Sequence, residues 1–503
     1  MKSNTISKIV IVGGGSAGWM TASALITIFP DKAITLIESP DIPTIGVGES
    51  TTNYMREWVN FLGLKDEEWM PECDATYKFG LKFIDFAEEE FYYPFGPRSE
   101  KVCNLAQWFT YAQSHNISNN DFGKVFYDQL PAMEQNRIPN NFIENESGYH
   151  FDAIKFANFL REKFAKPRGV IHKQQRVVEV YQDEHGIKSI ELDNGEIIVA
   201  DIYFDCTGFA GLLIDKTLKT PWISFQDKLC NNRTWAARIP YTDKLEELKP
   251  YTSCTALSSG WVWNVPLWNR IGTGYNYCDK FISPEDALLE FKKYLGPVSE
   301  QIEFRDLSWP TGVREKVWNK NVIAIGLSGG FIEPLESGGL YSVHEFLNAF
   351  FDVTEEHSCW SGVARDSFNY KCKEIFLTFA NFVELHYTMS RRNDTEYWKW
   401  YTNKENPIEN NSLIKQLIDY QHHNPYNVSE LNNMWFGLSM LVGGYKYPLR
   451  NKRKLKYFSN KFPEFELSKD LTEQIQLRIK NSESPQTQYL KNINFYEQKL
   501  YKN

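Results

Sequence analysis

The residues with the clearest chemical potential form a glycine-rich turn near the N-terminus. Gly13-Gly14-Gly15-Ser16-Ala17-Gly18 fits the pattern G-x-G-x-x-G, after an apolar β-branched run at residues 8–12 and before a helix-compatible stretch at residues 19–28. Glycines there permit a tight turn and let backbone N–H groups approach a pyrophosphate at the helix N-terminus. Glu38 ends the next strand-like run, 20 residues after Gly18, where a carboxylate can accept hydrogen bonds from ribose hydroxyls. We therefore predict a dinucleotide site that consists of Gly13, Gly15, Ser16, Ala17, Gly18 and Glu38; the simpler alternative is a turn that needs glycine only for close packing.

Two later segments favour FAD over NAD(P)H as the dinucleotide. Residues 204–211 run from an apolar strand into a turn of small residues, and residues 321–331 run from a strand into a glycine turn at a candidate helix N-terminus. Each segment alone is an ordinary connection between a strand and a helix. Together with the first turn they predict FAD binding that includes Gly208, Gly326 and Leu327. The sequence contains no second dinucleotide fingerprint for NAD(P)H.

A tryptophan-rich strand carries a family resemblance. Gly260-Trp261-Val262-Trp263-Asn264-Val265-Pro266 resembles the W-x-W-x-I-P signature of flavin-dependent tryptophan halogenases, with Val265 in place of isoleucine. Further segments resemble the family in the same order, at residues 46–51, 76–83, 150–152, 331–341 and 386–391, and the resemblance thins beyond about Trp400. The resemblance implies an enzyme that uses FADH₂, O₂ and a halide to make a hypohalous acid, which halogenates an electron-rich aromatic or heteroaromatic substrate. It also implies a separate NAD(P)H-dependent flavin reductase as the source of FADH₂.

The same resemblance assigns catalysis to one lysine and one carboxylate. Lys78 is the counterpart of the family lysine that receives or positions the hypohalous acid; an ammonium can hydrogen-bond this acid and polarise its halogen, or form a haloamine if its pKa is lowered. Read alone, Lys78 would be a solvated lysine on a strand face, and Lys82 is its rival. Glu336 matches the family carboxylate that accepts the substrate proton or orients the acid, with Glu333 as the nearby alternative. A structural ion pair is the simpler role for such a carboxylate.

The halide and substrate sites follow from neighbouring motifs. Ser337-Gly338-Gly339 offers successive backbone N–H groups in a glycine-tolerant geometry that suits an anion. Gly338 stands where the family commonly has threonine, so we expect room for a larger halide and a preference for bromide or iodide. Tyr93 and Phe95 resemble aromatic platforms on which a substrate can stack. The family's C-terminal aromatic lid has no clear equivalent near residues 427–445, which favours small aromatic substrates over free tryptophan alone.

These residues require an α/β fold to position them. The alternation of strands, glycine turns and helices predicts a Rossmann-like FAD-binding module of the flavoprotein monooxygenase type, with an inserted antiparallel β layer, over residues 1–350. Residues 351–503 read as a mainly helical substrate module. A period-two strand is predicted over Thr76–Phe83, and an amphipathic helix over Phe151–Phe164.

Composition limits the remaining functions. The 503 residues carry a formal net charge of −9, which argues against nucleic acid as a partner. No apolar stretch of about 18 residues is present, so we predict no membrane span. The eight cysteines form no C-x-x-C pair, so we predict no metal site and reduced thiols in the cytoplasm. The oligomeric state is left open, a homo-oligomer included, and the competing functions are an FAD-dependent aromatic hydroxylase and a non-catalytic flavin-binding protein.

Overall fold

The computed structural model divides the chain into two compact units. It describes residues 6–42, 49–95, 129–139, 147–356, 362–404, 440–441, 443–445, 473, 476–477 and 479–500. The first unit takes residues 1–75, 151–232 and 308–380, and the second takes residues 76–150, 233–307 and 381–503. This division differs from the predicted one at residue 350, because segments far apart in sequence pair within the same sheets. The α/β class is as predicted.

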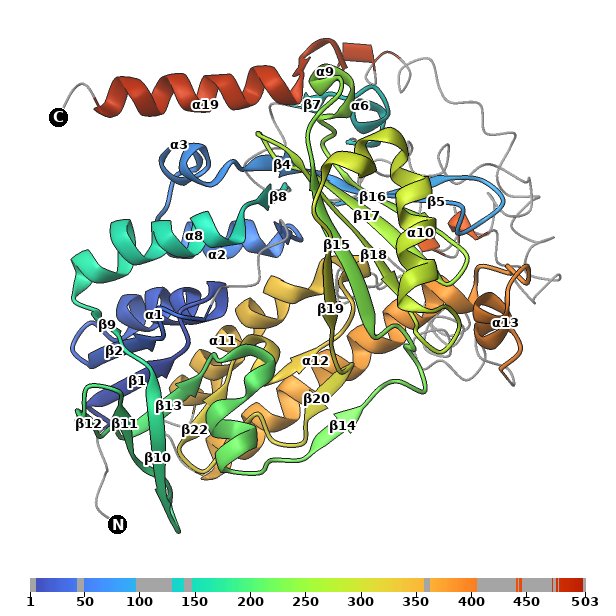
Figure 1. The fold of residues 1–503 in the computed structure, drawn as a ribbon. Coiled ribbons are helices and arrows are strands. Elements are labelled where there is room, and N and C mark those ends of the chain that lie inside the picture. The colour runs from blue at the N-terminus through green and yellow to red at the C-terminus, as the bar shows by residue number, and fades with distance from the viewer. Residues whose placement is uncertain are drawn as a thin grey trace, which may run out of the picture. The chain divides into compact units, whose positions relative to one another are not determined.

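A mostly parallel sheet forms the centre of the first unit (Figure 1). Its strands, in spatial order, are β21 (Trp318–Asn319), β22 (Val322–Ala324), β13 (Ile202–Asp205), β1 (Lys8–Val12), β2 (Ala33–Glu38) and β9 (Ile171–Gln174). The strand β1 pairs in parallel with both β13 and β2, and its residues Ile9–Val12 are buried. Such continuous apolar strands are typical of parallel sheets that are covered on both faces. The predicted opening of strand, glycine turn, helix and strand is confirmed, with α1 at Ser16–Ile28.

Smaller sheets and helices surround this centre. The two antiparallel sheets of the first unit are β10 (Val177–Asp183), β11 (Gly186–Leu192) and β12 (Ile197–Ile198), and β14 (Trp222–Ser224), β20 (Gly312–Arg314) and β23 (Gly330–Phe331); β3 is Glu49–Ser50. The helices are α2 (Tyr54–Phe61), α3 (Asp66–Trp69), α8 (Ala153–Phe159), α11 (Gly338–Glu356) and α12 (Gly362–Thr388), which continues into the second unit. Short helical turns are η1 (Pro71–Cys73), η3 (Leu160–Ala165), η4 (Lys166–Arg168), η5 (Gly208–Ala210), η6 (Leu212–Thr217), η8 (Gly326–Ser328) and η9 (Pro334–Glu336).

The helix predicted at residues 151–164 begins at a side-chain cap. The Asp152 carboxylate accepts hydrogen bonds from the backbone N–H groups of Ile154 and Lys155, at 3.0 and 3.1 Å. These are donors that the first turn of a helix leaves without an intrahelical acceptor. The α-helix then continues as the π-helical turn η3, so the prediction was right about the helix and missed its change of pitch.

The second unit is built on a long, mainly antiparallel sheet. Its strands, in spatial order, are β19 (Arg305–Ser308), β15 (Arg233–Ile239), β18 (Ile271–Tyr277), β17 (Gly260–Pro266), β16 (Thr252–Ala256), β5 (Gly80–Ile84) and β6 (Phe91–Pro94). Two shorter ladders join β4 (Thr76–Lys78) to β8 (Gly148–Phe151) and β7 (Ile138–Pro139) to β24 (Ser482–Glu483). The helices are α6 (Leu130–Glu134), α9 (Lys244–Glu247), α10 (Pro284–Leu295), α13 (Glu396–Thr402) and α19 (Pro485–Leu500), with the turn η7 (Gly296–Gln301).

The strand predicted over Thr76–Phe83 is wrong in one respect, because the chain forms two strands there. The strand β4 pairs with β8, whereas β5 pairs in parallel with β16 and antiparallel with β6. Between them, the Phe79 N–H donates to the carbonyl of Pro250 at 2.7 Å. Alternation of side chains is the same on both strands, so the sequence alone could not reveal this change of partner.

The C-terminal part is mainly helical where the structure describes it, apart from the short strand β24 and the connections between helices. The segment near residues 427–445, where the sequence shows no clear equivalent of the family's aromatic lid, lies mostly outside the described residues. Among the helices that the structure does describe, none combines the length and the apolar character required to cross a bilayer.

Candidate active site

The predicted cofactor residues of the first unit lie at the carboxyl ends of neighbouring parallel strands. Gly13 follows β1, Gly208 follows β13, Gly326 follows β22, and Glu38 ends β2. Because these strands run in the same direction, their carboxyl ends share one edge of the sheet. Open α/β sheets bind ligands at this edge, where the chain turns to either side of the central strand.

The first glycine turn requires glycine for physical reasons. Gly13 has φ +111°, and a Cβ atom there would lie 2.3 Å from the carbonyl oxygen of Cys206. A Cβ at Gly18 would lie 1.9 Å from the carbonyl oxygen of Gly13, so Gly18 lets the helix α1 approach the turn closely. Close packing therefore accounts for the glycine at position 18, and the role of this turn in cofactor binding stays a prediction.

The same edge fits FAD. Gly15 is the N-cap of α1 and has no side chain to occupy the free backbone N–H groups of the first turn, which suits a pyrophosphate. Gly326 lies against Ala17, with its Cβ position 2.8 Å from the Ala17 methyl group, so two of the predicted turns are adjacent. At Gly208 (φ +65°) a Cβ would meet no heavy atom within 4 Å, so the second turn borders open space. Ser16 donates to the carbonyl of Ala153 at 3.2 Å, and Leu327 lies in η8 beside Gly326.

Glu38 has two partners that the sequence did not suggest. Its Oε1 atom lies 2.6 Å from His172 Nε2 and 3.4 Å from Arg161 Nη1. The ring of His172 also packs edge-on against Trp19, with 5.0 Å between ring centroids. His172 lies on β9, paired in register with Leu36 of β2, and this strand pairing is a tertiary feature that no local motif announces. His172 and Arg161 thus hold the carboxylate that is expected to meet the ribose.

Lys78 in the second unit is completely buried, so the alternative of a solvated lysine is wrong. Its ammonium nitrogen lies 4.7 Å from the centroid of the Phe95 ring, within range of a cation–π interaction. Phe95 packs edge-on against Tyr93, with 6.2 Å between ring centroids. The structure therefore brings together the predicted catalytic lysine and both predicted substrate platforms.

The rival lysine differs in its surroundings. Lys82 lies on the other strand, β5, and its ammonium forms an ion pair of 2.7 Å with the half-exposed carboxylate of Glu90. It also lies 5.3 Å from the centroid of the Tyr92 ring. A lysine held in a surface ion pair is a poorer donor to a neutral acid than one held in an apolar interior.

The predicted carboxylate and halide residues of the first unit form one continuous turn. Glu336 is buried at the end of η9, and Ser337 follows with φ +61°, in the left-handed region. The Ser337 hydroxyl lies 3.0 Å from that of Ser50. Gly338 then begins α11. The alternative carboxylate, Glu333, accepts a hydrogen bond of 2.7 Å from the buried Asn231 amide, which is a structural role.

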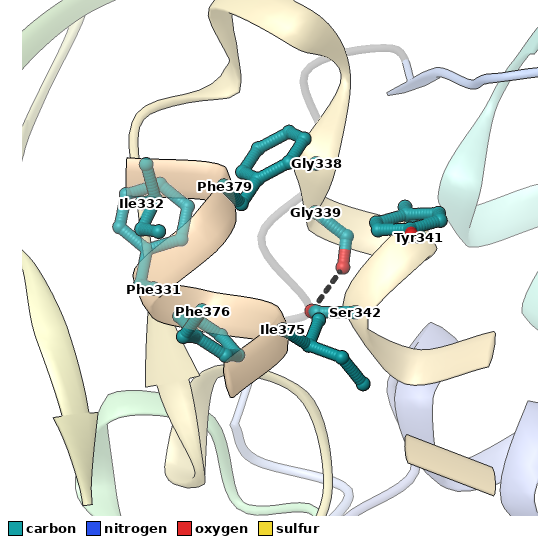
Figure 2. A pocket seen from close by; sticks show the side chains of 9 residues that line it. All are labelled: Phe331, Ile332, Gly338, Gly339, Tyr341, Ser342, Ile375, Phe376 and Phe379. Carbon is teal, nitrogen blue, oxygen red and sulfur yellow. Dashed lines mark hydrogen bonds between the residues drawn. The ribbon is translucent and has the colours of Figure 1, made fainter. Parts of the chain in front are cut away.

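A pocket adjoins this turn, and it corrects the expectation for Gly338 (Figure 2). Its lining residues are Phe331, Ile332, Gly338, Gly339, Tyr341, Ser342, Ile375, Phe376 and Phe379. A Cβ atom on Gly338 would lie 2.4 Å from Cε1 of Phe379. The missing side chain therefore leaves no vacant room, because the Phe379 ring fills it. Gly339 does border open space, with no heavy atom within 4 Å of its Cβ position.

The two signature tryptophans are core residues of β17. Trp261 is fully buried and Trp263 nearly so, with 6.0 Å between their ring centroids. A Cβ on Gly274 of the paired strand β18 would collide with the Trp263 ring at 2.2 Å. Both tryptophans therefore contribute to packing in this sheet.

Comparison with known proteins places the chain in a family. The family model for tryptophan halogenase matches residues 8–453. The chain belongs to the tryptophan halogenase family. It is 35% identical over 435 residues to the tryptophan 6-halogenase SttH of Streptomyces toxytricini, covering 79% of this chain and 81% of SttH. It is also 35% identical over 431 residues to the tryptophan 7-halogenase RebH of Lentzea aerocolonigenes, covering 80% of each chain. The solved structure of VirX1 superposes with a TM-score of 0.81 at 33% identity, covering 98% of this chain and 97% of VirX1.

This halogenase is accordingly a flavin-dependent oxidoreductase, and membership implies FAD and a halide together with a separate flavin reductase. The match extends to residue 453, past the point near Trp400 where the sequence resemblance thins. Within the described residues, no group of three or more His, Cys, Asp or Glu side chains could hold a metal ion.

Two further ionisable residues of this halogenase have environments that the sequence did not predict. Burial, followed by the charge of Asp152, raises the pKa of Glu49 to about 7. The sequence marked residues 46–51 as a family segment without giving Glu49 a role. His150 is completely buried, and burial and the charge of Lys78 lower its pKa well below 6.5. Neither environment can be read from the sequence, because both depend on residues brought together by folding.

Proposed function

We propose that this protein halogenates small electron-rich aromatic or heteroaromatic substrates, indoles included, through a hypohalous acid that is directed to Lys78. The proposal rests on the completely buried ammonium of Lys78, which lies 4.7 Å from the centroid of the Phe95 ring. A lysine is rarely buried without a reason, and here the lysine is the one that matches the family motif.

The first unit supplies the cofactor site in this proposal. The turns at Gly13, Gly208 and Gly326 and the carboxylate of Glu38 would hold FAD, with the pyrophosphate at the N-terminus of α1. When bound in its reduced form, FAD uses O₂ to oxidise a halide ion by two electrons to the level of hypohalous acid. The backbone N–H groups of Ser337, Gly338 and Gly339 would hold the halide.

Lys78 would polarise the hypohalous acid. Its ammonium donates a hydrogen bond to the oxygen of the acid and draws electron density away from the bond between oxygen and halogen. A substrate carbon then attacks the halogen, that bond breaks, and the oxygen leaves as hydroxide, which takes a proton to become water. In an apolar interior this hydrogen bond is stronger than in water.

Glu336 would complete the reaction by accepting the proton that the halogenated ring loses. The carboxylate is buried and next to the halide turn, and the family resemblance gives it this role. Its alternative role is to orient the hypohalous acid. Lys78 belongs to the second unit and Glu336 to the first.

The substrate class rests on aromatic side chains. Tyr93 and Phe95 can stack with a flat ring, and the relatives SttH and RebH are tryptophan halogenases. Because Phe95 already contacts Lys78, a stacked ring would lie close to the polarised halogen. Positioning of that ring would then decide which carbon reacts.

A preference for bromide or iodide is part of the proposal, although not for the reason expected from the sequence. The pocket beside Gly338 is lined mainly by aromatic and aliphatic side chains, above all the Phe379 ring. An apolar wall makes the halide lose water, and a larger halide ion loses its water at a lower cost. The preference would therefore come from desolvation and not from extra space.

The experiment that tests the function is mass spectrometry of reactions with FADH₂, one of three halides, and a panel of indoles, phenols and pyrroles. We expect products whose mass and isotope pattern follow the halide supplied. Incorporation of oxygen without halogen would instead identify an aromatic hydroxylase. Absence of oxygen-dependent turnover with FADH₂ would identify a non-catalytic flavin-binding protein.

A further inference from the structure

The strand that carries Lys78 is held by a neighbouring histidine. In the ladder of β4 and β8, Thr76 lies opposite His150 and Lys78 lies opposite Gly148. Side chains two residues apart on a strand share a face, so Thr76 and Lys78 project on the side where His150 contacts Thr76. Gly148 adds no side chain there, which leaves His150 as the diagonal neighbour of Lys78 on β8.

Four groups are linked in series by hydrogen bonds: a carbonyl, a hydroxyl, the ring of this histidine and a second hydroxyl. The Thr76 hydroxyl donates to the carbonyl of Pro266 at 2.7 Å, and its oxygen lies 3.3 Å from His150 Nδ1. The other ring nitrogen, Nε2, lies 2.9 Å from the hydroxyl of Thr252. All of these side chains are buried.

This series of hydrogen bonds fixes which nitrogen of the imidazole carries the proton. A threonine hydroxyl has one hydrogen, and Thr76 gives it to Pro266. Its oxygen can therefore only accept from His150, so Nδ1 must carry a hydrogen. Nε2 is then the acceptor for the Thr252 hydroxyl, and the neutral ring satisfies both nitrogens.

The charge state agrees with this arrangement. Burial and the neighbouring ammonium of Lys78 lower the pKa of His150, and the Pro266 carbonyl opposes them only in part, so the pKa stays well below 6.5. A charged imidazole would need a hydrogen on Nε2, where the Thr252 hydroxyl donates. It would also place a second cation beside Lys78.

The same hydrogen bonds connect β4, the strand of Lys78, to the signature strand β17. Pro266 ends β17, the strand of the two tryptophans, and Thr252 begins the adjacent strand β16. The ladder of β4 and β8 is thereby tied to two strands of the main sheet of the second unit. This gives the proline of the signature a structural purpose that its sequence position does not disclose.

We propose that His150 is a positioning residue for Lys78. Its neutral imidazole fixes β4 against the main sheet of the second unit and, because the ring carries no charge, places no second cation beside the reactive ammonium. The proposal rests on the proposed role of Lys78 in halogenation. It assigns no contact between His150 and the substrate.

A spectroscopic experiment tests the state of the ring without any turnover. The protein is labelled with ¹⁵N-histidine, and His150→Gln identifies the resonance of His150 among the nine histidines. We expect a hydrogen on Nδ1 and a pyridine-like Nε2 at every pH from about 5.5 to 8.5, although an ordinary histidine titrates in this range. A charged ring at about pH 6, or a hydrogen on Nε2, would overturn the proposal.

A kinetic experiment tests the consequence for Lys78. Thr76→Val removes the hydroxyl that links His150 to Pro266, and Thr273→Val is its matched control. Thr273 is also buried in the second unit, and its hydroxyl donates to a β17 carbonyl, that of Trp263, at 2.9 Å. The readout is halogenated product formed per flavin oxidised, with flavin oxidation measured separately.

We expect Thr76→Val to lower this ratio about tenfold, because a small displacement of the ammonium is costly, with flavin oxidation unchanged. Thr273→Val should keep the wild-type ratio despite a similar loss of thermal stability. His150→Gln should retain most of the ratio, since an amide can donate to Thr76 and accept from Thr252.

Equal ratios in the two threonine variants would refute the positioning role. Halogenation that survives in Lys78→Ala would instead refute the proposed function, leaving the spectroscopic result on His150 intact.

Discussion

At the scale of single residues, burial changes the meaning of two side chains that the sequence had marked. Lys78 has the appearance of a strand lysine in solvent, but it is buried against Phe95. Gly338 has the appearance of a missing side chain, but the ring of Phe379 occupies that space. The sequence identified both positions through the family motif. It could not supply their neighbours, because Phe95 and Phe379 reach them only through the fold.

The apolar wall of the halide pocket leads to a prediction for Phe379. Replacement of Phe379 by leucine should lower the ratio of brominated to chlorinated product about fivefold in equimolar halide, equivalent to about 1 kcal/mol. The smaller side chain admits water, so that chloride no longer has to lose its hydration. Competition assays read out by isotope patterns measure this ratio. The control is Phe331→Leu, because Phe331 lines the same pocket away from the Gly338 Cβ position. An equal fall of the product ratio in both variants would argue against a specific role of Phe379.

Glu49 leads to a prediction about pH. Folding raises its pKa from 4.5 to about 7, so the folded state favours the protonated form. The contribution of Glu49 to the free energy of unfolding is fully present below about pH 4.5 and is lost as the pH rises through about 7. Glu49→Gln, which stays neutral, should therefore exceed the wild type in stability by roughly 1–2 kcal/mol above pH 7, and by little at pH 5. Thermal melts at the two pH values measure the difference, and an equal difference at both would contradict the assigned environment.

At the scale of elements, the sequence predicted those helices, strands and turns that depend on neighbouring residues alone. The strand β1, the glycine turn and the helix α1 were predicted within a few residues, since an apolar run, glycines and a helical stretch specify them in order. The break between β4 and β5 was missed, because it depends on which distant strands are the partners. The partners of Glu38 were missed for the same reason, as His172 arrives through the pairing of β2 with β9.

The glycine turn gives a prediction that separates folding from cofactor binding. Gly13→Ala should destabilise the fold by at least about 1–2 kcal/mol, the cost of a positive φ alone, and the clash with Cys206 adds to this cost. Gly15→Val should leave the thermal melt of the apoprotein nearly unchanged but abolish FAD binding, because the side chain covers the helix N-terminus. Flavin titration and melting of both variants test this. Equal FAD affinity in Gly15→Val and the wild type would contradict the cofactor site.

At the scale of the whole molecule, the sequence predicted the α/β class but not the division into units. The predicted boundary at residue 350 follows the change from mixed to helical pattern. The structure instead keeps the first part of α12 in the first unit. There, Asn369 makes hydrogen bonds to both backbone groups of Trp318 on β21, at 2.8 and 2.9 Å, and Phe376 packs against Phe346 of α11.

This packing predicts that residues 1–350 do not form an independent domain. A fragment that ends at residue 350 loses these hydrogen bonds and exposes the buried face of α11, which should prevent a cooperative melt. Calorimetry and limited proteolysis of the fragment, with the full chain as reference, measure this. A single cooperative transition in the fragment would restore the predicted boundary.

Delivery of the halogen by Lys78 is tested by the yield of halogenated product in lysine variants. Halogenated product per flavin oxidised is compared among the wild type, Lys78→Ala and Lys82→Ala, with a scavenger present to remove hypohalous acid that diffuses free. We predict that Lys78→Ala forms almost no halogenated product while flavin oxidation continues at the wild-type rate, and that Lys82→Ala stays close to the wild type. Halogenated product from Lys78→Ala at the wild-type level under these conditions would contradict the claim.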